Sequence, residues 1–249
     1  MDRLHVATLN IRNLADRWAE RQGLVYADMA ALQPDLFGLQ ECVYPLQQDR
    51  LIGAAGAGRY GAVRGWAGRP EYGNSLLVRE PLVAREVERL DLGNNRAAHR
   101  AVIDLPAGGR VLVAITHLHH VPGDPALRLQ QVDALLPWLE AGPATDSRIV
   151  VGDFNATPDE PAYARMTAAG FRSAHLDANG SEPAVTWPSG LQAPMIDTDG
   201  EPGCLDYIWV AGAARVESCR VVFDRPAVED PTLFPSYHFG LAAWLVVGG

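Results

Sequence analysis

The chain carries short, unbroken apolar runs separated by stretches with helical periodicity. Runs of this length without polar alternation are typical of strands that are buried on both faces. The clearest runs are residues 4–9, 35–40 and 149–153. Apolar residues recur at helical spacing over 15–32 and 124–139, and a further helix is expected over 161–169, where Gly170 would end it.

Shorter strand patterns fill much of the remaining chain. They are predicted at residues 59–64, 74–78, 82–92, 98–105, 111–116, 205–210, 216–223 and 241–247. Turn signals between 73 and 116 are spaced for an antiparallel meander. We predict one domain over residues 1–249, an α/β fold built as two packed sheets with helices outside. The rest of 53–73 should be loop, and the long Pro- and Gly-rich segment 177–203 has the length of a functional loop.

Composition narrows the functional classes. Hydrophobic residues make up 48% and charged residues 20% of the chain, as in ordinary globular proteins. A net charge of -9 argues against tight, sequence-independent binding to duplex nucleic acid, although it leaves room for a local basic groove. Three scattered cysteines are too few for a disulfide framework or a cysteine-rich zinc site. Because neither a signal peptide nor a membrane-spanning run is visible, we expect a soluble, cytoplasmic monomer.

Polar side chains follow the apolar run at 149–153 at once. Asp153 and Asn155 lie two residues apart, so they share a face at the carboxyl end of the strand if strand geometry continues. Ligands often bind at such strand ends in α/β folds. The alternative is that both residues only form the turn into the next helix. Similar polar residues end or begin other predicted strands: Asn10, Glu41, His117, Asp206 and His238.

The chemistry of this set points to a metal-assisted reaction. Glu41, Asp153 and Asp206 offer the hard oxygen ligands that Mg2+, Mn2+ or Ca2+ prefer, and two or three carboxylates suffice for magnesium. The histidines at 117, 119 and 120 raise zinc as an alternative, but strand alternation should point His120 away from the other two. Asp206 and His238 form a plausible carboxylate–imidazole pair. Together these groups fit hydrolysis of a phosphate ester by activated water.

The same residues sit in an ordered set of short motifs. In chain order they are Thr8-Leu9-Asn10, Leu39-Gln40-Glu41, Gly73-Asn74-Ser75, Thr116-His117-Leu118, Gly152-Asp153-Phe154-Asn155, Leu205-Asp206-Tyr207 and Ser236-Tyr237-His238. Each motif alone is weak evidence, but in this order the set resembles the signature of the endonuclease/exonuclease/phosphatase superfamily, which includes the DNase I-like nucleases. The resemblance runs from Asn10 to His238, almost the whole chain.

The resemblance implies a four-layer α/β sandwich of two mixed, mainly antiparallel sheets flanked by helices. It also implies a phosphoric ester hydrolase that depends on Mg2+ or Mn2+. In this scheme Glu41 is the principal metal ligand, with Asn10 beside it and Asp206 available as a further ligand. Asp153 resembles the residue that positions water or serves the leaving group. Asn155 resembles a donor to a phosphate oxygen.

Further site residues follow from the same resemblance. His117 is similar to the histidine that DNase I-like members place on the phosphate. Asp206 and His238 resemble an orienting carboxylate and its histidine partner. Asn74 is expected on the phosphate side of the site. Arg100 is expected to approach the phosphate, with a plain surface charge as the alternative.

One position departs from the family pattern. The family usually has Ser-Asp-His where this chain has Ser236-Tyr237-His238. A tyrosine, with an ordinary pKa of about 10, cannot replace the carboxylate as an anionic ligand at neutral pH. Activity is still expected because Glu41, Asp153, Asp206 and His238 are all retained. A phosphate-binding relative that has lost turnover is the alternative.

The substrate is less constrained by the sequence. Trp187, in the long polar segment, is expected near the site, where it could stack a base, line a pocket or only cover the core edge. We expect a phosphate-ester substrate that is a small molecule, a lipid headgroup or a single-stranded nucleic acid. DNA nicking or abasic-site cleavage ranks second. A dinuclear zinc phosphoesterase ranks last because its Asp-x-His and Gly-Asn-His motifs are missing.

Overall fold

Two six-stranded sheets pack face to face in the computed structural model, which describes residues 1–56, 58–65, 71–196 and 199–248. The first sheet has the strand order β11-β12-β1-β2-β4-β3. Its strands are β1 (Asp2–Asn10), β2 (Leu36–Val43), β3 (Tyr60–Gly65), β4 (Tyr72–Arg79), β11 (Arg215–Val222) and β12 (Gly240–Val247). The second sheet has the order β5-β6-β7-β8-β10-β9. Its strands are β5 (Ala84–Gly93), β6 (Arg96–Asp104), β7 (Arg110–His117), β8 (Ser147–Asp153), β9 (Arg172–Ser173) and β10 (Asp206–Gly212).

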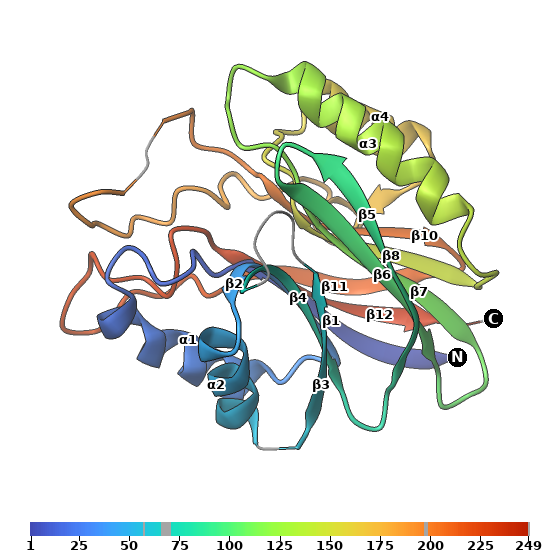
Figure 1. Cartoon of the computed structure of the whole chain (residues 1–249), viewed down its shortest axis with the longest axis horizontal. Coiled ribbons are helices and arrows are strands. Elements are labelled where there is room, and N and C mark those ends of the chain that lie inside the picture. Colours follow the sequence, from blue (N-terminus) through green and yellow to red (C-terminus); the bar gives the residue numbers. More distant parts are fainter. Residues whose placement is uncertain (57, 66–70, 197–198, 249) are drawn as a thin grey trace.

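Helices cover the outer faces of both sheets and complete four layers. They are α1 (Trp18–Leu32), α2 (Leu46–Ala55), α3 (Pro125–Glu140), α4 (Pro161–Ala168) and the short α5 (Ala174–Asn179). Figure 1 shows α1 and α2 on one side of the paired sheets and α3 and α4 on the opposite side. The α/β sandwich of two mixed, mainly antiparallel sheets expected from the sequence is therefore confirmed.

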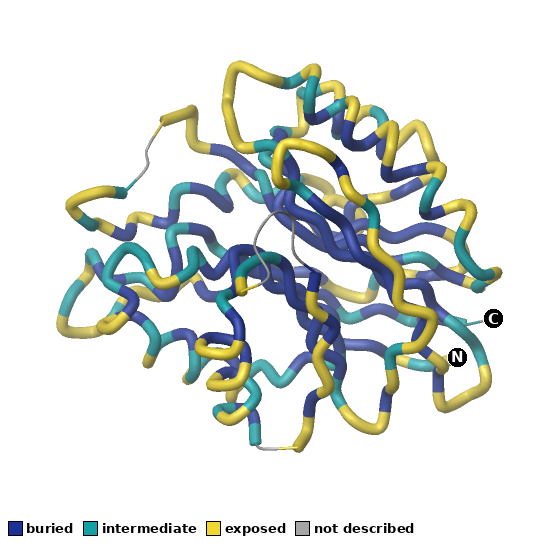
Figure 2. The backbone as a smooth tube through the Cα atoms, in the orientation of Figure 1, coloured by how far each residue is buried: buried dark blue, intermediate teal, exposed yellow. Residues whose placement is uncertain are grey.

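Side-chain alternation along the strands divides the core into three apolar clusters. Residues such as Val6 and Val151 face inward and fill the space between the sheets. Their neighbours face outward, Leu9 against α1 and α2, and Val150 against α3 and α4. Figure 2 shows the strands as the most buried part of the chain and the outer faces of the helices as exposed. Fully burying one such side chain stabilises the fold by roughly 1.5–3 kcal/mol.

Each sheet contains a single pair of parallel neighbours among the described strands. β1 runs parallel to β2 in the first sheet, and β7 runs parallel to β8 in the second. A helix joins each pair, α1 in the first case and α3 in the second. The carboxyl ends of parallel strands lie at one edge of a sheet, so the residues that follow the two strands of each pair lie close together. This arrangement positions the candidate site.

Three features differ from the elements expected along the sequence. β4 pairs with β2 and β3 in the first sheet, so the meander is limited to β5, β6 and β7 of the second sheet. α2 was not predicted, and its last residues fall in the expected loop 53–73, because its few apolar residues give little periodicity and its buried positions include Gln47 and Gln48. The described part of the segment 177–203 contributes the end of α5 and a bridge between Trp187 and Gly203. Residues 57, 66–70 and 197–198, in the two predicted loops, lie outside the described residues.

None of the described helices is long and apolar enough to span a membrane.

Candidate active site

The carboxyl ends of the two parallel strand pairs meet and bring polar side chains together from both sheets. Asn10 ends β1 and Glu41 lies near the end of β2, while His117 and Asp153 end β7 and β8 as register partners. Asn10 Nδ2 donates hydrogen bonds to Asp153 Oδ2 at 2.9 Å and to Glu41 Oε1 at 3.3 Å. One asparagine therefore links carboxylates that belong to different sheets.

Glu41 reaches this place because β2 contains a bulge. Strict alternation would turn its side chain outward, with Phe37 and Leu39. The register with β4 shifts between Leu39 and Cys42, and Glu41 adopts a left-handed φ of 54°. The extra residue leaves Cys42 facing outward like Leu39 and turns both Gln40 and Glu41 toward the space between the sheets. Such a backbone costs about 1 kcal/mol or more outside glycine, and strain of this kind clusters at functional sites.

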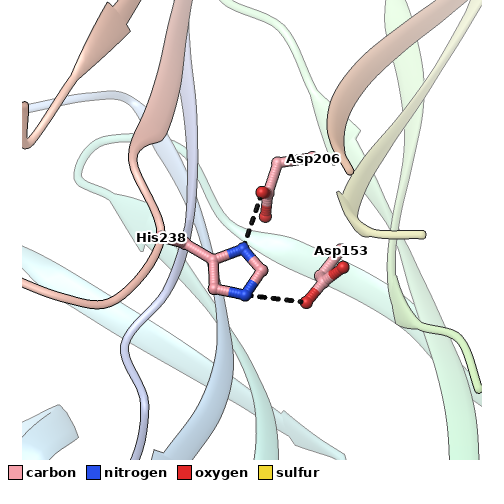
Figure 3. A group of neighbouring side chains, drawn as sticks. All are labelled: Asp153, Asp206 and His238. Carbon is pink, nitrogen blue, oxygen red and sulfur yellow. Dashed lines mark hydrogen bonds and ion pairs between the residues drawn. The ribbon is translucent and has the colours of Figure 1, made fainter. Parts of the chain in front are cut away.

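His238 lies between two buried carboxylates. Asp206, the first residue of β10, holds His238 Nδ1 through Oδ2 at 2.8 Å. On the other side of the ring, Nε2 lies 3.6 Å from Asp153 Oδ2. Figure 3 shows the imidazole between the two side chains. Asp206 and Asp153 are also register partners in adjacent strands, so strand pairing itself fixes the spacing of the carboxylates.

One oxygen of Asp153 is the meeting point of the site. Asp153 Oδ2 accepts the Asn10 bond and lies 3.5 Å from His117 Nε2, in addition to its contact with His238. The other oxygen, Oδ1, accepts a hydrogen bond from the backbone N–H of Asn155 at 2.9 Å. Asn155 has a left-handed φ of 48°, and its own Nδ2 donates to the carbonyl of Leu118. The predicted pair Asp153 and Asn155 is therefore brought together.

Burial and charge shift the pKa values of the central groups in different directions. Burial raises the pKa of Asp153, and the nearby Asp206 adds to the rise while His238 offsets part of it. Burial alone would lower the pKa of His238, but Asp206 and Asp153 outweigh it and leave that pKa above its ordinary value. Burial lowers the pKa of His117 well below the ordinary value, helped by Arg96. A proton is thus favoured on His238 and disfavoured on His117.

A cavity of about 620 Å³ opens onto these groups. Its lining includes four predicted site residues, Glu41, Asn155, Trp187 and His238. It also includes residues that sequence reasoning missed: Arg12, Asn13, Tyr72 and Arg96. Arg12 and Asn13 follow Asn10 so closely that the strand-end pattern could have suggested them. Arg96 starts a strand far from any motif and gave no such signal.

Arg12 and Tyr237 form a pair at the wall of the cavity. The Arg12 guanidinium carbon lies 4.3 Å from the centre of the Tyr237 ring. The Tyr237 ring in turn contacts the His238 ring edge to face, with centroids 4.5 Å apart. Burial raises the pKa of Tyr237 well above its ordinary value, and the negative charge of Glu41 acts in the same direction. Tyr237 is therefore a neutral phenol at the position where the family usually has a carboxylate.

Buried arginines on two helices fix the loops at the site. Arg21 of α1 is fully buried and donates hydrogen bonds to six backbone carbonyls, those of Ile11, Arg12, Asn13, Ala15, Asp16 and Pro235. Arg128 of α3 does the same for the loop after β7, through the carbonyls of His119, Val121 and Pro122, and also pairs with Glu160. Both loops follow the first strand of a parallel pair. In each strand pair, a buried arginine of the connecting helix therefore fixes the loop that precedes that helix.

Asn74 and Trp187, two predicted substrate-binding residues, both lie near the site but in different surroundings. Asn74 lies in a small cleft beside Glu41 and His117, where its Nδ2 donates to the carbonyl of Ala97 across the sheets. Trp187 lines the main cavity but is only 6% exposed. It therefore forms part of the cavity wall and offers little of its ring face for stacking. Ser189 and Thr186, its neighbours in the chain, tie this segment to residues 236–239.

Arg100 does not approach the site, and its predicted role is wrong. Its position in β6 alternates to the outer face of the sheet, where it stacks on Trp138 of α3 at 4.4 Å and pairs with Glu88 at 2.6 Å. The histidines at 117–120 also differ from expectation. β7 ends at His117, so alternation no longer holds beyond it, and the His119 and His120 rings contact each other at 5.5 Å while His117 faces Asp153.

The donor set fits a divalent cation of the hard class. Glu41 is only 7% exposed, and its two oxygens accept amide hydrogen bonds from Asn10 and from Asn13. Asp206 Oδ1 is buried and has no hydrogen-bond partner among the described residues. Ligand atoms of Asp153, Asp206 and His238 also lie within 4.8 Å of one another. That grouping is explained by the two contacts of the imidazole. Of the three carboxylates predicted as ligands, Glu41 is the one that lines the cavity.

Fold and site together define a class of protein: an α/β sandwich with buried carboxylates and histidines at one edge, as in hydrolases of phosphate esters. The sequence matches the Endonuclease/Exonuclease/phosphatase family over residues 7–238. The chain therefore belongs to this family, as the ordered motifs implied. Its members are hydrolases that act on phosphoesters, typically with a divalent metal.

Individual relatives extend the comparison. The chain is 28% identical to Nocturnin of Xenopus laevis over 252 residues, covering 90% of this chain and 62% of the relative. The chain thus spans about 60% of the length of that relative. Among solved structures, D. rerio TDP2 complexed with single strand DNA product matches with a TM-score of 0.81 at 17% identity, covering 99% of this chain and 100% of the other. A mannosyl-6-phosphatase of Bacteroides thetaiotaomicron matches with a TM-score of 0.78 at 20% identity, covering 98% and 100%. These structural likenesses show the shared fold.

Proposed function

We propose that this chain is a phosphoesterase that depends on Mg2+ or Mn2+ and cleaves its substrate by attack of an activated water. The observation that carries the proposal is the position of His238, held by Asp206 on one side and facing Asp153 on the other. Glu41 and Asn10, from the other sheet, would hold the metal ion. When bound, the ion would neutralise charge on the phosphoryl oxygens.

The side chains divide the remaining chemistry. Asp153, whose pKa is raised by burial, is the candidate base that orients the attacking water and takes its proton. His238 carries a proton and donates it, through Nε2, to a phosphate oxygen, while Asp206 holds Nδ1 and stabilises the charged ring. Asn155 and neutral His117 are candidate donors to the remaining phosphate oxygens. Asn74 would keep the edges of the two sheets at a fixed distance.

A small phosphorylated molecule is the preferred substrate class. The cavity, at about 620 Å³, has the size of a small-molecule site. Its lining includes the carboxylates of Asp159 and Glu201, which oppose the approach of a long polyanion. The net charge of -9 acts in the same direction. Single-stranded nucleic acid and lipid headgroups follow as candidates, and duplex DNA ranks below them.

Hydrolysis of p-nitrophenyl phosphate and bis-p-nitrophenyl phosphate, with and without Mg2+ or Mn2+, tests the proposal. The wild type should turn over at least one ester only when metal is present, and His238→Gln should lower kcat by roughly 100-fold or more. His175→Gln is the matched control, because His175 lies on α5, contacts the Ser181 carbonyl and does not line the cavity.

The role of Tyr237 is tested in the same assay. If only Tyr237→Asp turns over, the natural chain is a phosphate-binding relative without catalysis, and the proposal is wrong. Equal turnover of the wild type and His238→Gln would also contradict it.

A further inference from the structure

The guanidinium of Arg12 is held at the cavity with donors to spare. Its Nε donates to Asp16 Oδ2 at 2.6 Å, and its side chain is 18% exposed. Among the described residues, Asp16 is the only group that accepts a hydrogen bond from this side chain. Arginine has five N–H donors in a planar fork that matches the oxygens of a phosphate group. The two terminal NH2 groups of Arg12 are thus available to a ligand in the cavity.

The Tyr237 ring fixes where that guanidinium lies. The ring is held by an edge contact with His238 at 4.5 Å and a second edge contact with Trp187 at 6.5 Å. The Tyr237 carbonyl accepts the backbone N–H of Ser189 at 2.9 Å, which anchors the residue from behind. Arg12 rests on this supported ring at 4.3 Å. Arg12 already has one anionic partner, Asp16, at its Nε. A second carboxylate in place of the ring would offset more of its positive charge, whereas an aromatic face offsets none of it.

The replacement of a carboxylate by Tyr237 therefore changes the charge that the cavity offers to a phosphate. An aspartate at 237 would be a second anionic partner of Arg12, in addition to Asp16, and would compete with the substrate for its terminal NH2 groups, while the phenol is neutral. Arg96 lines the same cavity next to His120 and supplies a second positive charge. Two cations and the ion expected at Glu41 favour a ligand with the largest compact negative charge.

We propose that Arg12, held in place by the ring of Tyr237, binds the terminal phosphate of the substrate directly and makes the site selective for dianionic phosphate monoesters over diesters. This inference rests on the proposed function and names its substrate class. Arg12 contacts the phosphate, and Tyr237 is a positioning residue that acts through Arg12. A monoester with a second pKa of about 6 carries nearly two charges above neutral pH, whereas a diester carries one.

Binding of inorganic phosphate tests the inference without turnover. Calorimetric titration of phosphate above neutral pH, with and without Mg2+, should give a Kd that rises roughly 10- to 100-fold in Arg12→Ala, as expected for loss of charged hydrogen bonds. Arg3→Ala is the matched control. Arg3 lies over Trp244 at 4.2 Å, an equivalent contact that does not line the cavity. Its phosphate affinity should equal that of the wild type.

Conservative variants separate positioning by Tyr237 from a general structural role. Tyr237→Phe keeps the aromatic face and should bind phosphate like the wild type. Tyr237→Leu removes the face and should weaken phosphate binding by roughly 3- to 10-fold. The Tm of each variant is recorded beside its Kd. Equal affinity of the Phe and Leu variants would overturn the positioning role.

Selectivity is read from the ratio of kcat/KM for p-nitrophenyl phosphate to that for bis-p-nitrophenyl phosphate. Arg12→Ala should lower this ratio by roughly 10-fold, because the dianion loses more than the monoanion. Absence of phosphate binding by the wild type, unchanged affinity in Arg12→Ala, or an unchanged ratio would overturn the inference. Hydrolysis that depends on His238 but not on Arg12 would do so while leaving the proposed function intact. Phosphate binding that depends on Arg12 without any hydrolysis would support the role of Arg12 and contradict the proposed function.

Discussion

At the scale of single residues, the site depends on charges that are buried and yet closely partnered. Asp153 and Asp206 are both fully buried, and an unpaired carboxylate in such a place would be costly. The His238 ring between them supplies the positive partner. The same arrangement prepares the ring for proton transfer, because Asp206 fixes its orientation and its tautomer. Stability and chemistry therefore depend on the same three groups.

Asp206→Asn should separate these two roles. The amide preserves the shape of the side chain but no longer stabilises a protonated His238, so kcat should fall by roughly 100- to 10,000-fold. The Tm should change little, because the substitution removes the desolvation cost of the buried carboxylate together with its attraction to His238. The comparison is Asp133→Asn, on the exposed side of α3. Parallel loss of folding and activity would instead indicate a purely structural Asp206.

His99 should make stability depend on pH. Burial lowers the pKa of His99 to about 3, below an ordinary value of 6.5. The unfolded chain therefore binds a proton at pH values where the folded chain does not, so stability is present above pH 6.5 and is lost as pH falls toward the folded pKa. Relative to His99→Leu, the wild type should lose about 2 kcal/mol of unfolding free energy between about pH 7.5 and about pH 5.

Urea denaturation at both pH values measures this loss, and taking the difference across pH removes the packing effect of the substitution itself. His175→Gln, at a partly exposed ring, should follow the wild type at both pH values. An identical pH dependence of the wild type and His99→Leu would contradict the assignment.

At the scale of elements, a parallel strand pair and one buried arginine recur in both sheets. Arg21 of α1 and Arg128 of α3 each gather the backbone carbonyls of the loop between the first strand and the helix. The loop held by Arg21 contains left-handed residues, among them Arg12 and Asn13. Such a backbone persists only where its surroundings determine it. Through Arg21, α1 thus holds a strained loop against the cavity.

Arg21→Met should remove that support. Six carbonyls would lose their donor, so the unfolding free energy should fall by about 3 kcal/mol or more. Phosphate affinity should fall as well, because Arg12 lies in the same loop. Arg50→Met, on the exposed face of α2, is the control and should change stability by about 0.5 kcal/mol at most. Chemical denaturation measures the stability of both variants. Equal stability of the two would contradict the role of Arg21 in holding the loop.

Gly152 should be required for the close approach of β7 and β8. A Cβ at Gly152 would lie 2.1 Å from the Thr116 carbonyl oxygen, and the φ of 153° is unfavourable for other residues. Gly152→Ala should therefore lower the unfolding free energy by about 2 kcal/mol or more and displace Asp153. Gly23→Ala, in α1 with open space around it, should instead stabilise by about 0.5–1 kcal/mol. Thermal unfolding measures the stability of both variants, and a Gly152→Ala variant as stable as the wild type would contradict the prediction.

Elements with strong local patterns could be predicted from the sequence, and those fixed by distant contacts could not. The apolar runs at 4–9 and 149–153 identified buried strands because burial on both faces leaves a local signature. The sheet to which β4 belongs is set by pairing with β2 and β3, and no turn signal records that choice. The inward position of Glu41 depends on a bulge that alternation does not reveal. The strand-end pattern singled out Glu41 as a candidate ligand, and the family motif supported it, but neither predicted the bulge that turns it inward.

At the scale of the whole molecule, the two sheets contribute complementary halves of one site. The first sheet supplies Asn10 and Glu41, and the second supplies His117, Asp153 and Asp206. The hydrogen bond between Asn10 and Asp153 crosses from one sheet to the other. Neither half is complete alone, so the packing of the sheets is itself a requirement for activity.

The most direct test of the account is the dependence of phosphoester hydrolysis on metal and on Glu41 together. Initial rates are measured for the wild type and Glu41→Gln over a titration of Mg2+, after removal of bound metal with a chelator. The wild type should be inactive without metal and regain full activity with Mg2+ or Mn2+. Glu41→Gln should fold normally and lose roughly 100-fold or more in kcat/KM at every metal concentration. Hydrolysis that survives the chelator, or a Glu41→Gln variant as active as the wild type, would contradict the central claim.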